Sequence, residues 1–291
     1  MAKVLRLGYI KMEILKISTR DGISLHLDAM TVNQPLGVVC IIHGFGEHIG
    51  RYRHVMQSLN DSEFNVYGID LRGHGKSGGS KGHAPNLISL INDIEEFLKI
   101  VRSENLYLPL FLFGHSMGGN LVLNYVLRDN SKELSGFIVS APWINLAFKL
   151  PRWKEQLGHL MARIAPKVRL PNGLNSMHLS KNPEVAKQYN QDPLVDFKIS
   201  GGLISAINYG AAYLIKHQKE IKLSGFIFQG KLDAIIDYKS TMKLALGNPD
   251  NIKWKLWESV FHEAHNDLEQ KEVLKEWIDW MIHKIKASQF N

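Results

Sequence analysis

The feature that most constrains the fold of this chain is a regular alternation of short β-type runs with helical patterns. Eight runs rich in β-branched, aromatic and aliphatic residues are expected to form strands: EILKIS, SLHLDAM, GVVCIIHG, NVYGID, PLFLFG, GFIVSA, SGFIFQG and KWKLWE. From the third run onward these alternate with helical periods, as in Leu87 to Arg102 and Leu268 to Ile285. Such an order predicts an α/β fold, with a mostly parallel central sheet and helices on both of its faces.

The alternation stops between Pro142 and about Lys216, where helical stretches are joined by turns that contain Pro or Asn and no strand is expected. We therefore predict one core formed by residues 1–142 and 217–291, with a helical cap (lid) inserted at residues 143–216. One helix face in the cap gathers apolar side chains with basic residues close by: Trp153, Leu157, Leu160, Met161 and Ile164, with Lys149, Arg152, Lys154, Arg163, Lys167 and Arg169. This pattern is typical either of a lid that touches an interface or of an amphipathic helix packed on the core.

Composition limits the other classes of protein. The 291 residues are 45% hydrophobic, which is enough to bury one large core without a second independent domain. The formal net charge is +7, but no basic stripe is interleaved with aromatic residues, so we expect no nucleic-acid partner. The single cysteine, Cys40, lies in an apolar run, which excludes an intrachain disulfide and a thiolate metal cage. We expect Cys40 to be a small core residue.

Two further features bear on location. No stretch of about 18 uninterrupted apolar residues exists, so a membrane-spanning helix is not expected. Arg6 interrupts the apolar residues near the N-terminus, and residues 1–11 are interpreted as a loose extension or a start-site artefact, not as an export signal. We expect a cytoplasmic protein whose basic amphipathic cap is a candidate for transient contact with a membrane surface.

The segment GHSMG, from Gly114 to Gly118, has the pattern G-x-S-x-G directly after an apolar strand and directly before the helical run 120–128. A sharp turn between strand and helix forces the serine backbone into a strained conformation and needs glycines on both sides. The side chain of Ser116 would then project at the carboxyl edge of the sheet, beside the first N–H groups of the helix. Because those groups can stabilise negative charge, Ser116 is the predicted nucleophile.

A serine hydroxyl needs a base and an orienting acid, which in hydrolases with this turn follow in the order Ser, then Asp or Glu, then His. Asp233 comes just after the strand SGFIFQG, and His262 lies in the loop after KWKLWE. Asp237 is the rival acid, although it begins the next helix, and His265 is the rival base, although it begins the final helix. The segment HEAH is one residue short of the zinc-protease motif H-E-x-x-H, so no metal site is predicted.

Two backbone N–H groups are predicted to form an oxyanion hole. One belongs to Met117, the residue after the nucleophile, and the other to Phe45, in the loop IIHGFGEHIGRY after the third strand. His43, in the same loop, is interpreted as a residue that braces the loop and not as a base.

Several motifs occur together and in order: HGFGEHIGRY, DLRGHGKSGG, GHSMGG, SAPW and FHEAHND. In this combination the chain resembles the monoacylglycerol lipase and lysophospholipase branch of the serine α/β-hydrolase family, from about Ile14 to its end. The resemblance implies the α/β-hydrolase fold with an inserted cap. It also implies a catalytic triad of Ser116, Asp233 and His262. The implied oxyanion donors are the backbone N–H groups of Phe45 and Met117.

The resemblance further implies a small polar pocket that receives the glycerol head, at positions matching Glu47, Arg51 and His265. The chain departs from the branch at Phe261, where Tyr is common before the base, and it reads ESVFHE where a Gly-rich run is often found. The implied activity is hydrolysis of carboxylic esters of single-chain lipids, above all monoacylglycerol to fatty acid and glycerol, without a metal or organic cofactor. The alternatives are a lysophospholipase, a general carboxylesterase or, in a different class, a non-catalytic ligand receptor on the same fold.

A second apolar set in the cap bears on the acyl chain of such a substrate. These residues repeat at helical spacing: Leu203, Ile204, Ile207, Ala211, Leu214 and Ile215. The pattern predicts either the wall of an acyl tunnel or a helix packed against the core.

Overall fold

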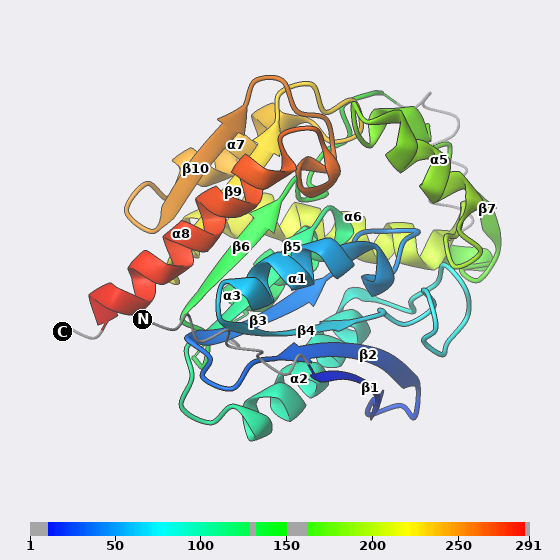
Figure 1. Cartoon of the computed structure of the whole chain (residues 1–291). Helices are drawn as coiled ribbons and strands as arrows, with labels where there is room; N and C mark the ends of the chain where they lie inside the picture. Colours follow the sequence, from blue (N-terminus) through cyan, green and yellow to red (C-terminus); the bar gives the residue numbers. More distant parts are fainter. Residues whose placement is uncertain (1–10, 129–131, 150–161, 289–291) are drawn as a thin grey trace, which may run out of the picture.

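The computed structural model describes residues 11–128, 132–149 and 162–288, and its centre is an eight-stranded sheet in the order β1-β2-β4-β3-β5-β6-β9-β10 (Figure 1). The strands are β1 (Lys11–Ser18), β2 (Ser24–Thr31), β3 (Gly37–Ile42), β4 (Phe64–Ile69), β5 (Leu110–His115), β6 (Gly136–Ser140), β9 (Gly225–Gly230) and β10 (Ile252–Trp257). β2 pairs antiparallel with β1 and β4, whereas all other neighbours in the sheet are parallel. Each of the eight predicted strands is present, and the predicted α/β fold with a mostly parallel sheet is confirmed.

Helices cover both faces of the sheet because successive side chains of a strand point to opposite sides. In β3, Val38, Cys40 and Ile42 belong to one hydrophobic cluster, and Val39 and Ile41 belong to a second. The first cluster also holds buried side chains of α2 (Leu87–Glu104), α3 (Met117–Leu127), α6 (Gly201–His217) and α7 (Tyr238–Leu246). The second holds those of α1 (Arg53–Asp61) and α8 (Gln270–Ser288). Burial on both faces explains why the central strands read as continuous apolar runs.

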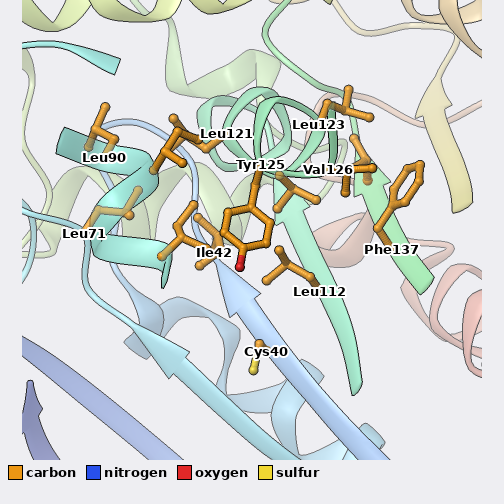
Figure 2. Packing of buried hydrophobic residues seen from close by; sticks show 14 of the residues in the cluster. Cys40, Ile42, Leu71, Leu90, Leu112, Leu121, Leu123, Tyr125, Val126 and Phe137 are labelled. Carbon is orange, nitrogen blue, oxygen red and sulfur yellow. The ribbon is translucent and has the colours of Figure 1, made fainter. Parts of the chain in front are cut away.

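Figure 2 shows the first cluster from close by, where α3 lies over the parallel strands at the centre of the sheet. The ring of Tyr125 reaches from α3 toward the sheet, near Ile42 and Leu112. Cys40, two residues before Ile42 on β3, is fully buried, and burial raises the pKa of its thiol. Cys40 is therefore the core residue that the sequence predicted.

The part of the cap that contains α5 and β7 lies at one end of the molecule in Figure 1, and α6 runs from there toward the centre. This part of the cap contains α5 (Pro183–Gln191) and two strands, β7 (Arg169–Pro171) and β8 (Lys198–Ser200), which pair antiparallel. The prediction that this region has no strand is wrong. Each strand has only three residues, which is too short for an alternating pattern to show in the sequence.

Most of the apolar side chains of helix α6 pack into the main core and do not line a tunnel. Leu203, Ile207 and Leu214 are fully buried in the first cluster, and α6 contacts α3 and α2. Ile204 faces the cavity described below, and Ile215 is exposed. Packing against the core is therefore the correct alternative for most of this set. The other apolar face predicted in the cap lies largely outside the described residues, at Trp153, Leu157, Leu160 and Met161.

Short 3-10 helices lie at four turns of the described chain: η1 (Ile49–Tyr52), η2 (Ser176–His178), η3 (Gln218–Glu220) and η4 (Ala264–Asn266). One of them corrects a prediction, because the final helix α8 begins at Gln270 and His265 lies in η4 before it. None of the helices that the structure describes is long and apolar enough to cross a membrane.

Candidate active site

The turn between β5 and α3 holds Ser116 in an unusual backbone conformation. Its φ is +52° and its ψ is −114°, in a region that L side chains rarely adopt. The flanking glycines are required, because a Cβ on Gly118 would lie 2.2 Å from the carbonyl oxygen of Ile42 and one on Gly114 would lie 2.4 Å from that of Gly118. Hydrogen bonds keep the turn in place, since the Ser116 N–H donates to the carbonyl of Ser140 at 2.9 Å. The strained serine therefore projects from the end of β5, at the first turn of α3.

Asp233 and His262 form a buried pair, although 29 residues separate them in the chain. His262 Nδ1 donates to Asp233 Oδ2 at 2.8 Å, while Asp233 Oδ1 accepts from the N–H groups of Ile235 and Ile236. Gln229 Nε2 donates to Oδ2 as well, so the carboxylate is held in one orientation. Burial lowers the pKa of His262, but the charge and hydrogen bond of Asp233 outweigh it, and the net shift is upward. With Nδ1 protonated for Asp233, Nε2 of the neutral ring is the free acceptor.

The rival acid has a different task. Asp237 lies at the start of α7, where its side chain accepts from the N–H of Lys239 at 3.1 Å and caps the helix. Asp233 alone of these two carboxylates contacts His262.

The rival base, His265, lies behind the site and not at its wall. Its ring is fully buried and stacks on Tyr52, with the centroids 4.8 Å apart, and it lies 4.8 Å from the ring of His115. Burial lowers its pKa to about 3, so the imidazole is neutral. This position corrects the expectation that His265 reaches a substrate hydroxyl, because the side chain is absent from the described lining of the cavity.

The loop after β3 is braced by the residues around Phe45. His43 Nε2 accepts from the N–H of Leu71 at 2.9 Å, so its Nδ1 carries the proton and donates to the carbonyl of Gly44. Gly44 N–H in turn donates to Glu47 Oε1 at 2.7 Å. His43 thus braces the loop, as its interpretation from the sequence required.

The two predicted oxyanion donors belong to the segments next to Ser116. Phe45 lines the same cavity as Ser116, and its ring packs edge-on against Trp143. Met117 is the first residue of α3, where backbone N–H groups have no carbonyl partner in the helix. The oxyanion hole formed by these two N–H groups remains a prediction.

Glu47, Arg51 and Glu263 form a buried charged cluster next to His262. Arg51 donates to Glu47 Oε2 at 2.6 Å and to both oxygens of Glu263 at 2.7 Å, and its guanidinium lies over the ring of Tyr189. Burial, together with the charge of Glu263, raises the pKa of Glu47. Burial also pushes up the pKa of Glu263, but the charge and hydrogen bonds of Arg51 outweigh it and lower that pKa to about 2. One cation thus serves two carboxylates.

A cavity of about 430 Å³ joins these groups to the cap. Ser116, His262, Glu47 and Glu263 lie in its wall, whereas Asp233 is behind His262. Most of the remaining wall is apolar and comes from both the cap and the loops of the core, including Leu146, Phe148, Leu174, Leu179, Ile204 and Ile235. The site therefore combines a polar catalytic end with an apolar extension.

Glu263 was not singled out by sequence reasoning. It directly follows His262, but no spacing rule signals that its side chain turns back to meet Arg51, 212 residues earlier in the chain. Tyr189 and Leu179 were missed as well, because they come from a cap whose sequence pattern does not show which residues face inward. Among the described residues, no group of three or more His, Cys, Asp or Glu is placed to hold a metal ion.

Fold and site together define a serine hydrolase of the α/β-hydrolase fold. The family model described as serine aminopeptidase, S33, matches residues 33–269, and the chain belongs to this family. An uncharacterized abhydrolase domain-containing protein of Dictyostelium discoideum is 30% identical over 95% of this chain, and the chain spans 30% of that protein's length. A monoacylglycerol lipase of Mycolicibacterium smegmatis is 29% identical over 90% of this chain and 94% of its own. The crystal structure of a Paleococcus ferrophilus monoacylglycerol lipase has a TM-score of 0.77 and 30% identity, covering 94% of this chain and 100% of that one.

Proposed function

We propose that this protein hydrolyses carboxylic esters of single-chain lipids, with monoacylglycerol cleaved to fatty acid and glycerol through an acyl-enzyme on Ser116. The observation that carries the proposal is the buried contact of 2.8 Å between His262 and Asp233, beside a serine held at φ +52°. Ser116 and His262 share the wall of a cavity that is mostly apolar. The monoacylglycerol lipases among the relatives favour the same substrate class.

In the acylation step, His262 Nε2 accepts the proton of Ser116 Oγ while Oγ bonds to the ester carbonyl carbon. The N–H groups of Phe45 and Met117 hold the oxyanion that forms. When the tetrahedral intermediate collapses, the bond to the glycerol oxygen breaks and His262 passes its proton to that oxygen.

In deacylation, a water molecule loses a proton to His262 Nε2 and attacks the acyl carbon. The bond to Ser116 Oγ breaks, the proton returns to Oγ, and the fatty acid leaves. Asp233 remains ionised throughout and stabilises the imidazolium form of His262 in both steps.

The charged cluster favours a neutral glycerol head over a phosphate-bearing one. Glu47 and Glu263 line the cavity as acceptors for hydroxyl groups, and the guanidinium of Arg51 is already engaged by both. The cluster therefore carries a formal excess of one negative charge, which repels a phosphodiester. Glycerol is the better match for this end of the cavity. Glu47 keeps its assignment to the head-group pocket, whereas Arg51 is absent from the described lining and acts through its contacts with Glu47 and Glu263.

The same cluster bears on peptidase activity, which the description of the family model suggests. An aminopeptidase needs an acidic group that is free to bind the amino terminus of its substrate. Here Arg51 forms ion pairs with both carboxylates at 2.6 and 2.7 Å, so neither is without a cation, while their remaining lone pairs still accept from hydroxyl groups. The relatives described as monoacylglycerol lipases favour ester hydrolysis over peptidase activity.

We assign residues 143–216 to a cap that closes the acyl end of the cavity. Leu146, Leu174 and Leu179 line the cavity from this segment and pack against Ile235 and Ile236 of the core, which line it as well. A mostly apolar cavity of about 430 Å³ suits a single-chain lipid better than a triacylglycerol.

The cap also carries features of a surface that contacts lipid. Ile164 is 68% exposed, Met177 is 54% exposed, and Val168 and Leu170 are exposed as well. Basic residues alternate with them in the segment RIAPKVRL, which starts at Arg163. Peripheral contact with an anionic membrane would cover these side chains, and we expect the protein to float with phosphatidylglycerol vesicles but not with phosphatidylcholine vesicles.

The experiment compares wild type with Ser116→Ala on a monoacylglycerol, a lysophospholipid, a short-chain ester and an aminoacyl anilide. We expect fatty-acid release from the monoacylglycerol to exceed the other rates and to fall by about 10⁶-fold in Ser116→Ala. Undiminished release by the variant would end the assignment of Ser116. A preference for the lysophospholipid or the anilide would keep the nucleophile and overturn the head-group argument.

A further inference from the structure

Asp267 is a buried carboxylate five residues after His262 that the proposed mechanism does not use. Its side chain accepts hydrogen bonds from backbone N–H groups that precede it and follow it in the sequence. Oδ2 accepts from the N–H of Phe261 at 2.7 Å, directly before the base. Oδ1 accepts from the N–H of Leu268 at 2.7 Å and from that of Lys181 at 3.1 Å. One carboxylate thus closes the loop that carries His262 and ties it to a segment 86 residues earlier.

The segment it reaches belongs to the wall of the cavity. His178 and Leu179 line the cavity, and the carbonyl of Leu179 accepts from the N–H of Glu263 at 2.7 Å. Ser180 Oγ donates to the carbonyl of Asn266 at 3.0 Å, one residue before Asp267. These bonds join the cap wall to the base loop at successive positions, on both sides of η4.

We propose that Asp267 is a positioning residue that fixes the loop of His262 against the cap, so that the base and the acyl wall move as one unit. This inference rests on the proposed function, in which His262 is the base. Its physical ground is the placement of the hydrogen bonds. The hydrogen bond from the Phe261 N–H fixes the backbone directly before His262. The hydrogen bond from the Lys181 N–H links the same carboxylate to the cap.

The position of residue 267 requires a side chain that accepts hydrogen bonds with both of its terminal atoms. An ionised carboxylate offers two acceptor oxygens, whereas an amide of the same shape offers one and turns an NH₂ group toward the other partner. In Asp267→Asn, that NH₂ group faces either the N–H of Phe261 or the N–H groups of Lys181 and Leu268. The loop must then shift to separate two donors.

The test measures kcat and KM of purified wild type and Asp267→Asn on a water-soluble short-chain ester, together with the low-field proton resonance of His262 Nδ1–H. That resonance is identified by its loss in Asp233→Asn. We expect kcat to fall about 100-fold with KM within about twofold, because small displacements of a catalytic group cost rate more than binding. The resonance should move or broaden, since the His262 to Asp233 contact is no longer held in one geometry.

Asp237→Asn is the matched control, because it changes a carboxylate that accepts from the Lys239 N–H and the Ser240 hydroxyl of α7 without contact to His262. Its kcat and its resonance should equal those of wild type, since Asn and Asp cap helices equally well. Ser180→Ala provides a milder variant in case Asp267→Asn fails to fold, and it should lower kcat several-fold in the same direction.

A lower melting temperature with wild-type kcat and an unmoved resonance in a folded variant would overturn the positioning role. The resonance reports the hydrogen bond between His262 and Asp233, whether or not Ser116 is the nucleophile. It therefore tests this inference even if Ser116→Ala proves to be active. In that event the proposed function fails, while the position of His262 is still measured.

Discussion

The catalytic end of the cavity is held by hydrogen bonds, whereas its acyl end is enclosed by apolar contacts. Asp233 accepts from His262, Gln229 and two backbone N–H groups, and Glu47 accepts from three donors. At the other end, Phe148 is 48% exposed and lines the cavity without a directional contact. The difference follows from the chemistry, because bond making needs atoms in fixed places and an acyl chain needs only a dry surface.

The two ends should therefore respond differently to mutation. Removal of one polar group at the catalytic end leaves a buried partner unpaired, which is costly. Removal of a methyl group from the acyl wall changes area by a small amount.

Asp233→Asn should lower kcat by about 10⁴-fold on any ester, because an amide cannot hold the Nδ1–H tautomer of His262. Steady-state kinetics with a short-chain ester measure this, and circular dichroism provides the control for folding. The Asp237→Asn variant should keep wild-type kcat. Equal losses of kcat in both variants would show that the contact between His262 and Asp233 is not the cause of the lower rate.

Arg51→Met should destabilise the protein by about 3–5 kcal/mol, because it leaves the carboxylates of Glu47 and Glu263 buried without a cation. Urea unfolding followed by tryptophan fluorescence gives the free energy. A second variant, Lys253→Met, removes a surface ion pair with Glu276 and should change it by less than about 1 kcal/mol. Similar values for the two would contradict the assigned burial of the cluster.

A plot of kcat/KM against pH should fall on the acid side, and the midpoint of this fall should lie above pH 6.5, which is the ordinary pKa of histidine. The pKa of His262 is raised by the charge and hydrogen bond of Asp233 against the effect of burial. Below that pKa the ring is protonated and cannot accept the proton of Ser116, so the rate should fall about tenfold per pH unit. Kinetics in a constant-ionic-strength buffer series measure this fall, and a midpoint below 6.5 would show that Asp233 does not outweigh burial.

Leu174→Ala should have the smallest effect, about fivefold in KM for a long-chain monoacylglycerol and none for a short-chain ester. The side chain lines the apolar wall and forms no hydrogen bond with Ser116, Asp233 or His262, so we expect only about 1 kcal/mol of apolar contact to be lost. The ratio of the two substrates' kcat/KM values measures the effect. A matching loss with the short ester would mean that the Leu174 side chain supports the catalytic end, as we propose only for the hydrogen-bonded segment from Leu179 to Lys181.

The order of strands and helices could be predicted because each run is buried on one or both faces of the sheet, which leaves a clear pattern. Asp233 and His262 were found by the same route. Each follows a strand, and the carboxyl ends of parallel strands meet at one edge of the sheet. Ser116 was visible because a sharp turn demands Gly114 and Gly118. These signals are local and survive in the linear sequence.

The direction of side chains in the turns could not be predicted. His265 and His262 are three residues apart, yet one ring packs against Tyr52 and the other lies at the cavity. The difference depends on η4 and on contacts with segments far away in the chain, as does the turn of Glu263 toward Arg51. The strands β7 and β8 escaped prediction for the same reason, since pairing across 27 residues stabilises two three-residue segments.

The most direct test of the central claim is rapid quenching of the reaction with a monoacylglycerol, followed by mass spectrometry of the peptide that contains Ser116. We predict an added acyl group on Ser116 during turnover, absent from Ser116→Ala and longer-lived in Asp233→Asn. Turnover of the ester with no acyl group on that peptide, or with the group on another residue, would contradict the account.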